Sequence, residues 1–88
     1  MNERDLERIL KALGNKRRLA AVNYIRKEKV ASVTAIAKNI KLSLRSTSRH
    51  LGILLTADIL EREQAGLMVY YNISKDAPLI VKEILKFL

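Results

Sequence analysis

The segment Ser43–Leu51, SLRSTSRHL, carries side chains suited to hydrogen bonding with nucleic acid. Six of its nine residues are Ser, Thr or Arg, a seventh is the only histidine of the chain, and none is acidic. Arginine reads guanine O6 and N7 through two parallel hydrogen bonds, and small hydroxyls donate to or accept from base edges and phosphates. An acid on the same face would repel the phosphate backbone. The composition therefore favours a helix that lies in the major groove of DNA over a surface helix that contacts only solvent.

Two short helices are expected to position these side chains. Thr34 can cap a helix through residue 40, and Ser43 can cap the next, residues 43–57, with only two residues between them. On a helical wheel of the second helix, the leucines fall on one side and the arginines on the other. This pattern indicates a helix-turn-helix. The candidate DNA contacts in and before the second helix are Lys41, Ser43, Arg45, Ser46, Ser48, Arg49 and His50.

The other elements follow from hydrophobic periodicity and capping signals. Apolar residues at helical spacing predict a helix at 3–13 capped by Asn2, and Asn15 can cap a second helix after it. The step VASV is compatible with one short strand. From residue 59 the period changes to two, so 59–73 is expected to form a β-hairpin that turns at Ala65–Gly66. Its returning strand places three apolar side chains on one face: Val69, Tyr71 and Ile73.

The final segment, 77–88, is expected to be a helix with Pro78 in its first turn and apolar side chains on more than one face. A chain of 88 residues has no core large enough to cover such a helix. We therefore expect a homodimer whose interface combines this helix with the first one, 3–13. The expected interface residues are Leu6, Ile9, Leu10, Leu79, Ile80, Ile84, Leu85, Phe87 and Leu88.

Length and patterning predict one small domain, residues 1–88, that is mainly α with a small β-hairpin. Its predicted order is helix, helix, short strand, helix, helix, hairpin, helix. The net charge of +8 is concentrated, because Lys11 to Arg49 contains eleven Lys or Arg residues and one acid. A basic middle of this kind favours a polyanionic partner. Candidate phosphate contacts outside the helix-turn-helix are Lys16, Arg17 and Arg18.

Several other function classes are disfavoured. The chain has no cysteine, and His50 alone cannot make a metal site, so neither a metal nor another cofactor is expected. No paired acids, glycine-rich phosphate loop or nucleophile–base spacing suggests an enzyme. No secretory signal is present, and no apolar run approaches the roughly 18 residues needed to cross a bilayer, so a cytoplasmic protein without a membrane partner is expected.

Three strings together resemble the winged helix-turn-helix repressors of the ArsR type: ALGNKRRL, LS with SRHL shortly after it, and VYYNI. The resemblance spans about residues 6–74. It implies that the helix holding Arg45 to Arg49 enters the major groove, that the hairpin 59–73 is a wing reaching the flanking minor groove, and that the first and last helices form the dimer. It also adds Arg62 and Gln64, in or near the wing, to the candidate DNA contacts.

The chain departs from the family pattern at several positions. Lys41 stands where the turn often has Gly, and Asp58 replaces the Gly that usually closes the recognition helix. Gly52 lies in the middle of that helix, where close backbone approach is one reason for a glycine. The wing, EREQAG, is nearly neutral. The cysteine or histidine ligands of the family's metal sensors are absent, so whether a small-molecule effector is sensed stays open.

The sequence thus predicts a sequence-specific regulator that binds double-stranded DNA as a homodimer and acts as a repressor. Two alternatives remain open at this point: a non-specific architectural or chromatin-type DNA binder, and a winged helix used for contact with an acidic protein. Arg45 distinguishes specific from non-specific binding. If binding is sequence-specific, Arg45→Ala relaxes the base preference at one position. If binding is non-specific, the same substitution weakens binding to every DNA sequence alike.

Overall fold

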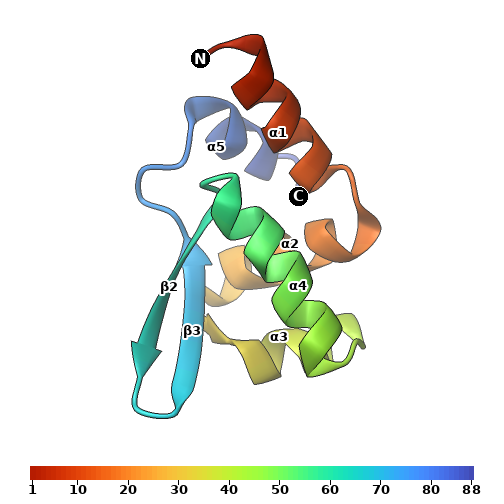
Figure 1. Ribbon diagram of the computed structural model, residues 1–88, viewed down its shortest axis with the longest axis vertical. Helices are drawn as coiled ribbons and strands as arrows, with labels where there is room; N and C mark the ends of the chain where they lie inside the picture. The colour runs from red at the N-terminus through yellow and green to blue at the C-terminus, as the bar shows by residue number, and fades with distance from the viewer.

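Figure 1 shows helices along the whole length of the molecule and a β-hairpin that lies beside them in its lower half. The computed structural model describes residues 1–88, and the predicted class and order of elements are confirmed. No helix combines the length and the apolar character needed to cross a membrane. The elements are α1 (Glu3–Leu13), α2 (Lys16–Glu28), β1 (Ala31–Ser32), α3 (Val33–Ile40), α4 (Leu44–Thr56), β2 (Leu60–Ala65), β3 (Met68–Ile73) and α5 (Leu79–Leu85).

Side-chain caps begin three of the helices where the sequence predicts them. Asn2, Asn15 and Ser43 accept hydrogen bonds at 2.9, 3.0 and 3.1 Å from the backbone N–H three residues further on. Each bond satisfies one N–H that has no partner within the helix. The starts of α1, α2 and α4 are therefore set locally.

The prediction that Thr34 caps α3 is wrong. Ser32 is the cap, because its Oγ accepts a hydrogen bond of 3.1 Å from Ala35 N, and the helix begins at Val33. Ser32 is the last residue of β1 and already has the extended backbone that a cap requires, with ψ 156°. The chain therefore passes from strand to helix with no loop between them.

The last helix is shorter than predicted. Pro78 does not lie in the first turn of α5 but precedes it, because its ψ of 148° is extended. Its carbonyl oxygen accepts the first hydrogen bond of the helix, 2.9 Å from Val81 N. After Leu85 the chain continues to Leu88 in turns closed by bonds to the residue three back, which are tighter than those of an α-helix.

The three strands form one antiparallel sheet in the order β1-β3-β2. The short strand expected at VASV is β1, which pairs Ala31 with Tyr71. The hairpin turns at Gly66 and Leu67, one residue later than predicted, because Ala65 still pairs with Met68 in the sheet. Gly66 has a φ of 64°, a left-handed conformation that suits glycine. Tyr71 is buried, and Val69 and Ile73 are partly buried against the core, so the predicted inner face of the returning strand is confirmed.

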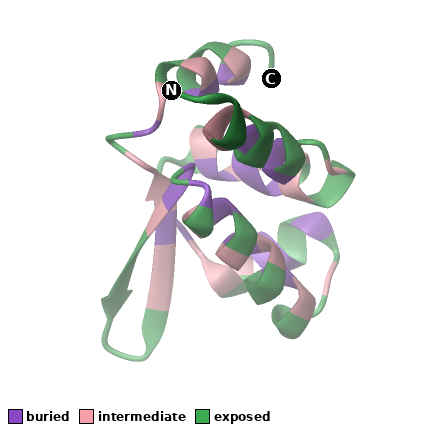
Figure 2. Ribbon diagram, turned by 45° about the horizontal axis from the view of Figure 1, so that its top comes forward, coloured by how far each residue is buried: buried purple, intermediate pink, exposed green.

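The core lies where α2, α3 and α4 meet the base of the hairpin. Figure 2 shows the buried segments gathered between the helices, with an exposed hairpin tip. Buried apolar residues from every helix and every strand join a single cluster. Its fully buried large apolar members are Val22, Ile25, Ile36, Leu51, Leu54, Ile59 and Val81.

Three helices end in residues other than glycine that have a positive φ, and the first of these is Lys29, with φ 71°, at the end of α2. Lys41 closes α3 with φ 59°, and Asp58 follows α4 with φ 59°. Both stand where the resembling family often has glycine, and each carries a Cβ that this conformation disfavours. Gly52 behaves differently: a Cβ built there meets no atom within 4 Å, so close backbone approach does not explain this glycine.

Candidate nucleic-acid interface

Helix α4 has one face in the core and one face in solvent. Thr47, Leu51 and Leu54 are buried, whereas Arg45 and Arg49 are exposed one helical turn apart. Ser48 is also exposed, and Ser46 and His50 are half-buried on the flanks. The predicted contact residues of α4 therefore form one accessible surface, which we call the α4 face: Arg45, Ser46, Ser48, Arg49 and His50.

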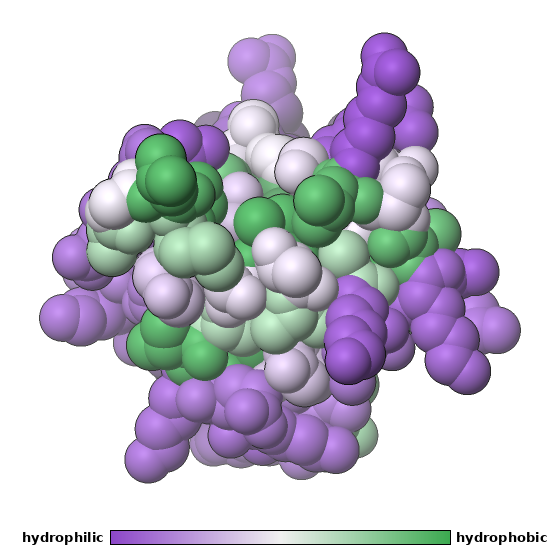
Figure 3. Space-filling view, turned by 90° about the horizontal axis from the view of Figure 1, so that it is seen from below, coloured by the Kyte–Doolittle hydropathy of each residue, from purple (hydrophilic) through white to green (hydrophobic).

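The α4 face lies at the same end of the molecule as the tip of the hairpin. In Figure 1 the N-terminal half of α4 lies beside α3 at the lower end, and the β2–β3 turn reaches that end too. Figure 3 views this end and shows hydrophilic side chains projecting around a middle of weakly polar and apolar ones. A surface that joins a helix and a hairpin tip can contact two adjacent grooves of a duplex.

Apart from Lys11, the cations of the basic middle of the chain pair with no side-chain carboxylate. The three ion pairs are Arg8–Asp5, Lys11–Glu7 and Lys86–Glu83, all within α1 or at the end of α5. None involves a residue of α2, α3 or α4. The charge of Lys16, Lys41, Arg45 and Arg49 is therefore available to an external anion.

Arg17 binds within the protein. Its Nη1 donates to the carbonyl oxygens of Ile40 at 2.6 Å and Lys41 at 3.4 Å, so the guanidinium caps the C-terminal end of α3. Cations are favourable at this end of a helix because its last carbonyls lack partners. Arg17 is exposed and stays a predicted phosphate contact, and its Nη1 in addition holds the turn of the helix-turn-helix.

Arg18 also binds within the protein and reaches two other helices. Its Nε donates to Ala12 O at 2.6 Å and its Nη2 to Lys11 O at 3.1 Å, both at the C-terminal end of α1. Its Nη1 lies 3.1 Å from His50 Nδ1 on α4. One guanidinium therefore connects α1 with the α4 face. Neither internal role is visible in the local sequence, because Ile40 and His50 lie 23 and 32 residues from their arginines.

His50 is held neutral by its surroundings. Burial lowers the pKa of its imidazole most, and the positive charges of Arg18, Arg49 and Arg17 lower that pKa further. The ordinary value is about 6.5, so a lowered pKa leaves the ring uncharged at pH 7. The histidine of the α4 face is therefore a polar group without charge.

The nearly neutral wing has different chemistry on its two faces. Directly opposed residues of an antiparallel pair point to the same side of the sheet. Arg62 is paired with Tyr71 and Gln64 with Val69, so Arg62 and Gln64 lie on the face directed toward the helices. Both are exposed, because the hairpin extends beyond the core at these positions. The predicted wing contacts thus share the side of the sheet that holds α4.

The acids of the wing lie on the opposite face. Glu61 and Glu63 are paired with Asn72 and Tyr70, one residue out of phase with Arg62. Asn72 Nδ2 donates to Glu61 at 2.8 Å, and this bond is the main cause that lowers the pKa of the Glu61 carboxyl. Leu67, at the tip, is fully exposed (100%). The wing therefore turns its cation toward the α4 face and its carboxylates away from it.

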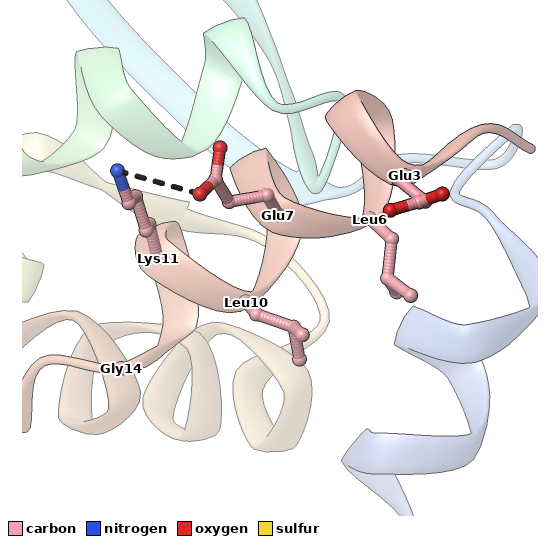
Figure 4. Close-up of a pocket in the computed structure, with 6 residues that line it drawn as sticks. All are labelled: Glu3, Leu6, Glu7, Leu10, Lys11 and Gly14. Carbon is pink, nitrogen blue, oxygen red and sulfur yellow. Dashed lines mark ion pairs between the residues drawn. The ribbon is translucent and has the colours of Figure 1, made fainter.

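A second exposed surface is formed by α1 and α5. Figure 4 shows Leu6 and Leu10 on the same side of α1, in a hollow of about 520 Å³ that Glu3, Glu7, Lys11 and Gly14 also line. Leu10 is 49% exposed and Phe87 is 89% exposed. Further apolar side chains that are exposed or half-buried in these segments are Leu79, Ile80, Ile84 and Leu88.

Two residues predicted for a dimer interface lie in the core instead. Ile9 is 3% exposed and Leu85 is 8% exposed, and both belong to the hydrophobic cluster. The helical faces that carry them pack against the rest of the chain, so only the other apolar residues of α1 and α5 remain accessible.

The chain is similar in sequence and in structure to known transcriptional regulators. No family model matches it. The transcriptional repressor PagR of Bacillus anthracis is 34% identical over 74 residues, which make up 84% of this chain and 74% of that protein. This chain belongs to the ArsR family of winged helix-turn-helix regulators. The crystal structure of PagR has a TM-score of 0.79 at 32% identity, over 96% of this chain and 92% of that one.

Other ArsR-type structures share the fold. Reduced HlyU of Vibrio cholerae has a TM-score of 0.85 at 25% identity, covering 99% of this chain and 87% of that one. The homodimeric winged helix-turn-helix DNA-binding domain Mb0332 of Mycobacterium bovis has a TM-score of 0.81 at 27% identity, covering 96% and 74%. In this ArsR chain, no group of three or more His, Asp or Glu side chains is placed to hold a metal ion.

Proposed function

We propose that this ArsR-family chain is a homodimeric transcriptional repressor of the cytoplasm that binds a specific sequence of double-stranded DNA. Its function in this proposal is binding and not catalysis. PagR, a relative at 34% identity, is a transcriptional repressor, and Mb0332 is a homodimeric DNA-binding domain. Helix α4 would lie in the major groove and the β2–β3 hairpin would follow the adjacent minor groove.

The observation that carries this proposal is the α4 face, which is exposed, cationic and free of acids. Arg45 and Arg49 project from it one turn apart, and no intramolecular carboxylate pairs with either. A guanidinium in this position can form the two-pronged bond to guanine. Ser46 and Ser48 supply small hydroxyls beside them for bases or phosphates.

The remaining cations fall into two groups, those that are exposed without internal partners and those that bind backbone carbonyls within the chain. Lys16 and Lys41 are exposed without internal partners, which supports a role in phosphate binding. Arg62 lies on the helix side of the wing, which supports a contact in or beside the minor groove. Arg17 and Arg18 are engaged by backbone carbonyls, so we assign them to holding the interface in shape.

A second copy of the chain is the proposed cover for the apolar residues of α1 and α5. Side chains as exposed as Leu10 and Phe87 favour burial in a partner, and a twofold dimer buries the same surface on both copies. Two α4 faces related by this symmetry would read two half-sites about one helical turn apart.

The experiment that tests the function is selection of binding sites from a random duplex library at about 150 mM salt, where binding through phosphates alone is weak. We expect recovery of a twofold symmetric motif. Recovery of no motif, with binding that vanishes as salt rises, would assign the chain to non-specific architectural binding. Absence of DNA binding at any salt concentration would favour a winged helix that contacts protein.

A matched pair of variants then tests the α4 face on the selected duplex. Arg45→Ala is expected to weaken binding by about 1–3 kcal/mol and to relax the preference at one base-pair position of each half-site. Lys75→Ala removes an exposed cation from the β3–α5 connection, which adjoins the segment after the C-terminal end of α4 and not the N-terminal half that carries Arg45, since Ser74 N donates to Ile59 O. It is expected to leave the affinity and the base preference unchanged. Equal losses in the two variants would contradict base reading by Arg45.

A further inference from the structure

We propose that Arg18 is a positioning residue that fixes the tautomer of His50, so that His50 presents its Nε2–H as a directed, uncharged hydrogen-bond donor to DNA. The DNA part of this inference rests on the proposed function, whereas the tautomer is a property of the free protein. The sequence predicts His50 as a DNA contact and Arg18 as a phosphate contact, whereas the fixed tautomer and the role of Arg18 in setting it go beyond that prediction.

The tautomer follows from what each group can do. Arg18 Nη1 lies 3.1 Å from His50 Nδ1, and a guanidinium has only donors. Nδ1 must therefore accept, and an imidazole whose Nδ1 accepts carries its proton on Nε2. The opposite tautomer would set N–H against N–H at hydrogen-bonding distance.

The guanidinium is held so that it cannot easily turn away from the ring. Arg18 Nε is bound to Ala12 O at 2.6 Å and Nη2 to Lys11 O at 3.1 Å, which leaves Nη1 directed at His50. These two carbonyls end α1 and have no helical N–H partner beyond them. Three anchored nitrogens on one planar group fix the position of the acceptor side of the ring.

The free side of the ring belongs to the α4 face. His50 is half-buried between exposed Arg49 and buried Leu51, so part of the imidazole reaches solvent. Ser46 is half-buried on the same flank, four residues earlier in the helix. With Nδ1 occupied, the donor that the ring can offer to a phosphate or a base acceptor is Nε2–H.

The donor is neutral because the ring is partly buried and every charged group that faces it is cationic. Burial lowers the pKa of the imidazole most, and Arg18 and Arg17 from α2 and Arg49 from α4 lower that pKa further. A neutral donor releases no counterion when it binds DNA. The salt dependence of affinity therefore separates His50 from Arg45 and Arg49, each of which contributes about 0.9 to the slope.

The first test uses the free protein and long-range ¹⁵N–¹H NMR of the single histidine. At pH 7.5 we expect wild type to show the Nε2–H tautomer and Arg18→Gln to show a mixture, with an imidazole pKa closer to its ordinary value. A wild-type ring protonated on Nδ1, or a mixture in wild type, would overturn the inference whatever the protein does with DNA. The wild-type spectrum alone can overturn the inference, so this outcome does not depend on whether Arg18→Gln folds.

The second test measures affinity for the duplex selected by the wild-type protein. The amide nitrogen of Gln can take the place of Nε2, whereas that of Asn reaches only the level of Nδ1. We expect His50→Gln to bind within about threefold of wild type, and His50→Asn and His50→Ala to lose about tenfold, all with an unchanged salt slope. Equal binding by all three variants would overturn the donor role. Failure of wild type to select any duplex would instead defeat the proposed function and leave the tautomer to the NMR test.

Discussion

Arg17 Nη1 lies 2.6 Å from the carbonyl oxygen of Ile40, joining the first turn of α2 to the last turn of α3. The bond links the helix-turn-helix to α2, which is not part of that motif. It lies at the point where Lys41 adopts a left-handed backbone and the chain turns toward α4. The geometry of the α4 face relative to α3 therefore depends on a residue more than twenty positions earlier in the chain.

Arg17→Met is expected to lower the free energy of unfolding by about 1–2 kcal/mol, because the carbonyls at the end of α3 lose a charged donor. Lys16→Met is the matched control, since Lys16 has no internal partner, and is expected to stay within about 0.5 kcal/mol of wild type. Urea unfolding measures both. The effects on DNA binding are expected to be the opposite. Lys16→Met should lower the slope of log affinity against log salt concentration by about 0.9, and Arg17→Met should leave this slope unchanged. A loss of slope in Arg17→Met with unchanged stability would return Arg17 to the phosphate contacts.

Gly52→Ala is expected to raise the free energy of unfolding by about 1 kcal/mol. The residue lies inside α4, where glycine is less favourable than alanine, and a Cβ there meets no atom within 4 Å. Gly66→Ala is the contrasting change, because Gly66 has φ 64°, and it should lower stability by about 1 kcal/mol. Thermal or urea unfolding of both variants measures these two changes in the free energy of unfolding. A destabilised Gly52→Ala would mean that α4 packs more tightly than this structure describes.

Thr47→Val is expected to raise the free energy of unfolding by about 1 kcal/mol. Thr47 is fully buried on α4 and its hydroxyl oxygen has no hydrogen-bond partner, so a methyl group of similar size removes the desolvation cost. Thr56→Val is the control on the same helix: its exposed hydroxyl donates to Gly52 O at 3.0 Å, and little change is expected. A loss of stability in Thr47→Val would reveal a polar partner for the buried hydroxyl.

Stability is expected to fall as the pH is lowered from 7.5 toward 5.5, and His50 is the group responsible. Its folded-state pKa lies below the unfolded value of about 6.5, so in this window the unfolded chain binds more protons than the folded one. The lowered pKa of Glu61 acts only at more acidic pH, around and below the ordinary range of a glutamate. Urea unfolding at three pH values, compared with His50→Gln, measures the effect. Parallel pH profiles for the two proteins would contradict it.

Local signals in the sequence predict most of the fold. The caps at Asn2, Asn15 and Ser43 and the alternation in β3 involve partners within a few residues, so the pattern alone defines them. The cap at α3 is mispredicted because Ser32 and Thr34 both have the right side chain. Only the pairing of Ser32 with Tyr70 in the sheet selects between them, and that is a tertiary contact.

The site is less predictable than the fold, for the same reason. The exposed arginines of α4 follow from helical periodicity, but the internal roles of Arg17 and Arg18 depend on carbonyls that the fold brings close. The two faces of the wing likewise need the register of β2 with β3, because the string EREQAG alone does not show that its arginine and its two glutamates lie on opposite faces of the sheet. In α1 and α5, apolar periodicity alone does not separate core residues such as Ile9 from exposed ones such as Leu10.

Leu10→Glu is expected to convert the proposed dimer into a monomer without unfolding the chain. Leu10 is half exposed in the structure, so the substitution disturbs the core little, but it would place a carboxylate inside the interface near Glu7. A charge buried at the centre of an interface raises the dissociation constant by about 30-fold or more. Sedimentation at micromolar concentration measures the change, and Leu67→Glu, on the fully exposed wing tip, is the control that should stay dimeric. If Leu10→Glu remains dimeric while Leu67→Glu dissociates, the copies join through the wing, and α1 and α5 face a different partner.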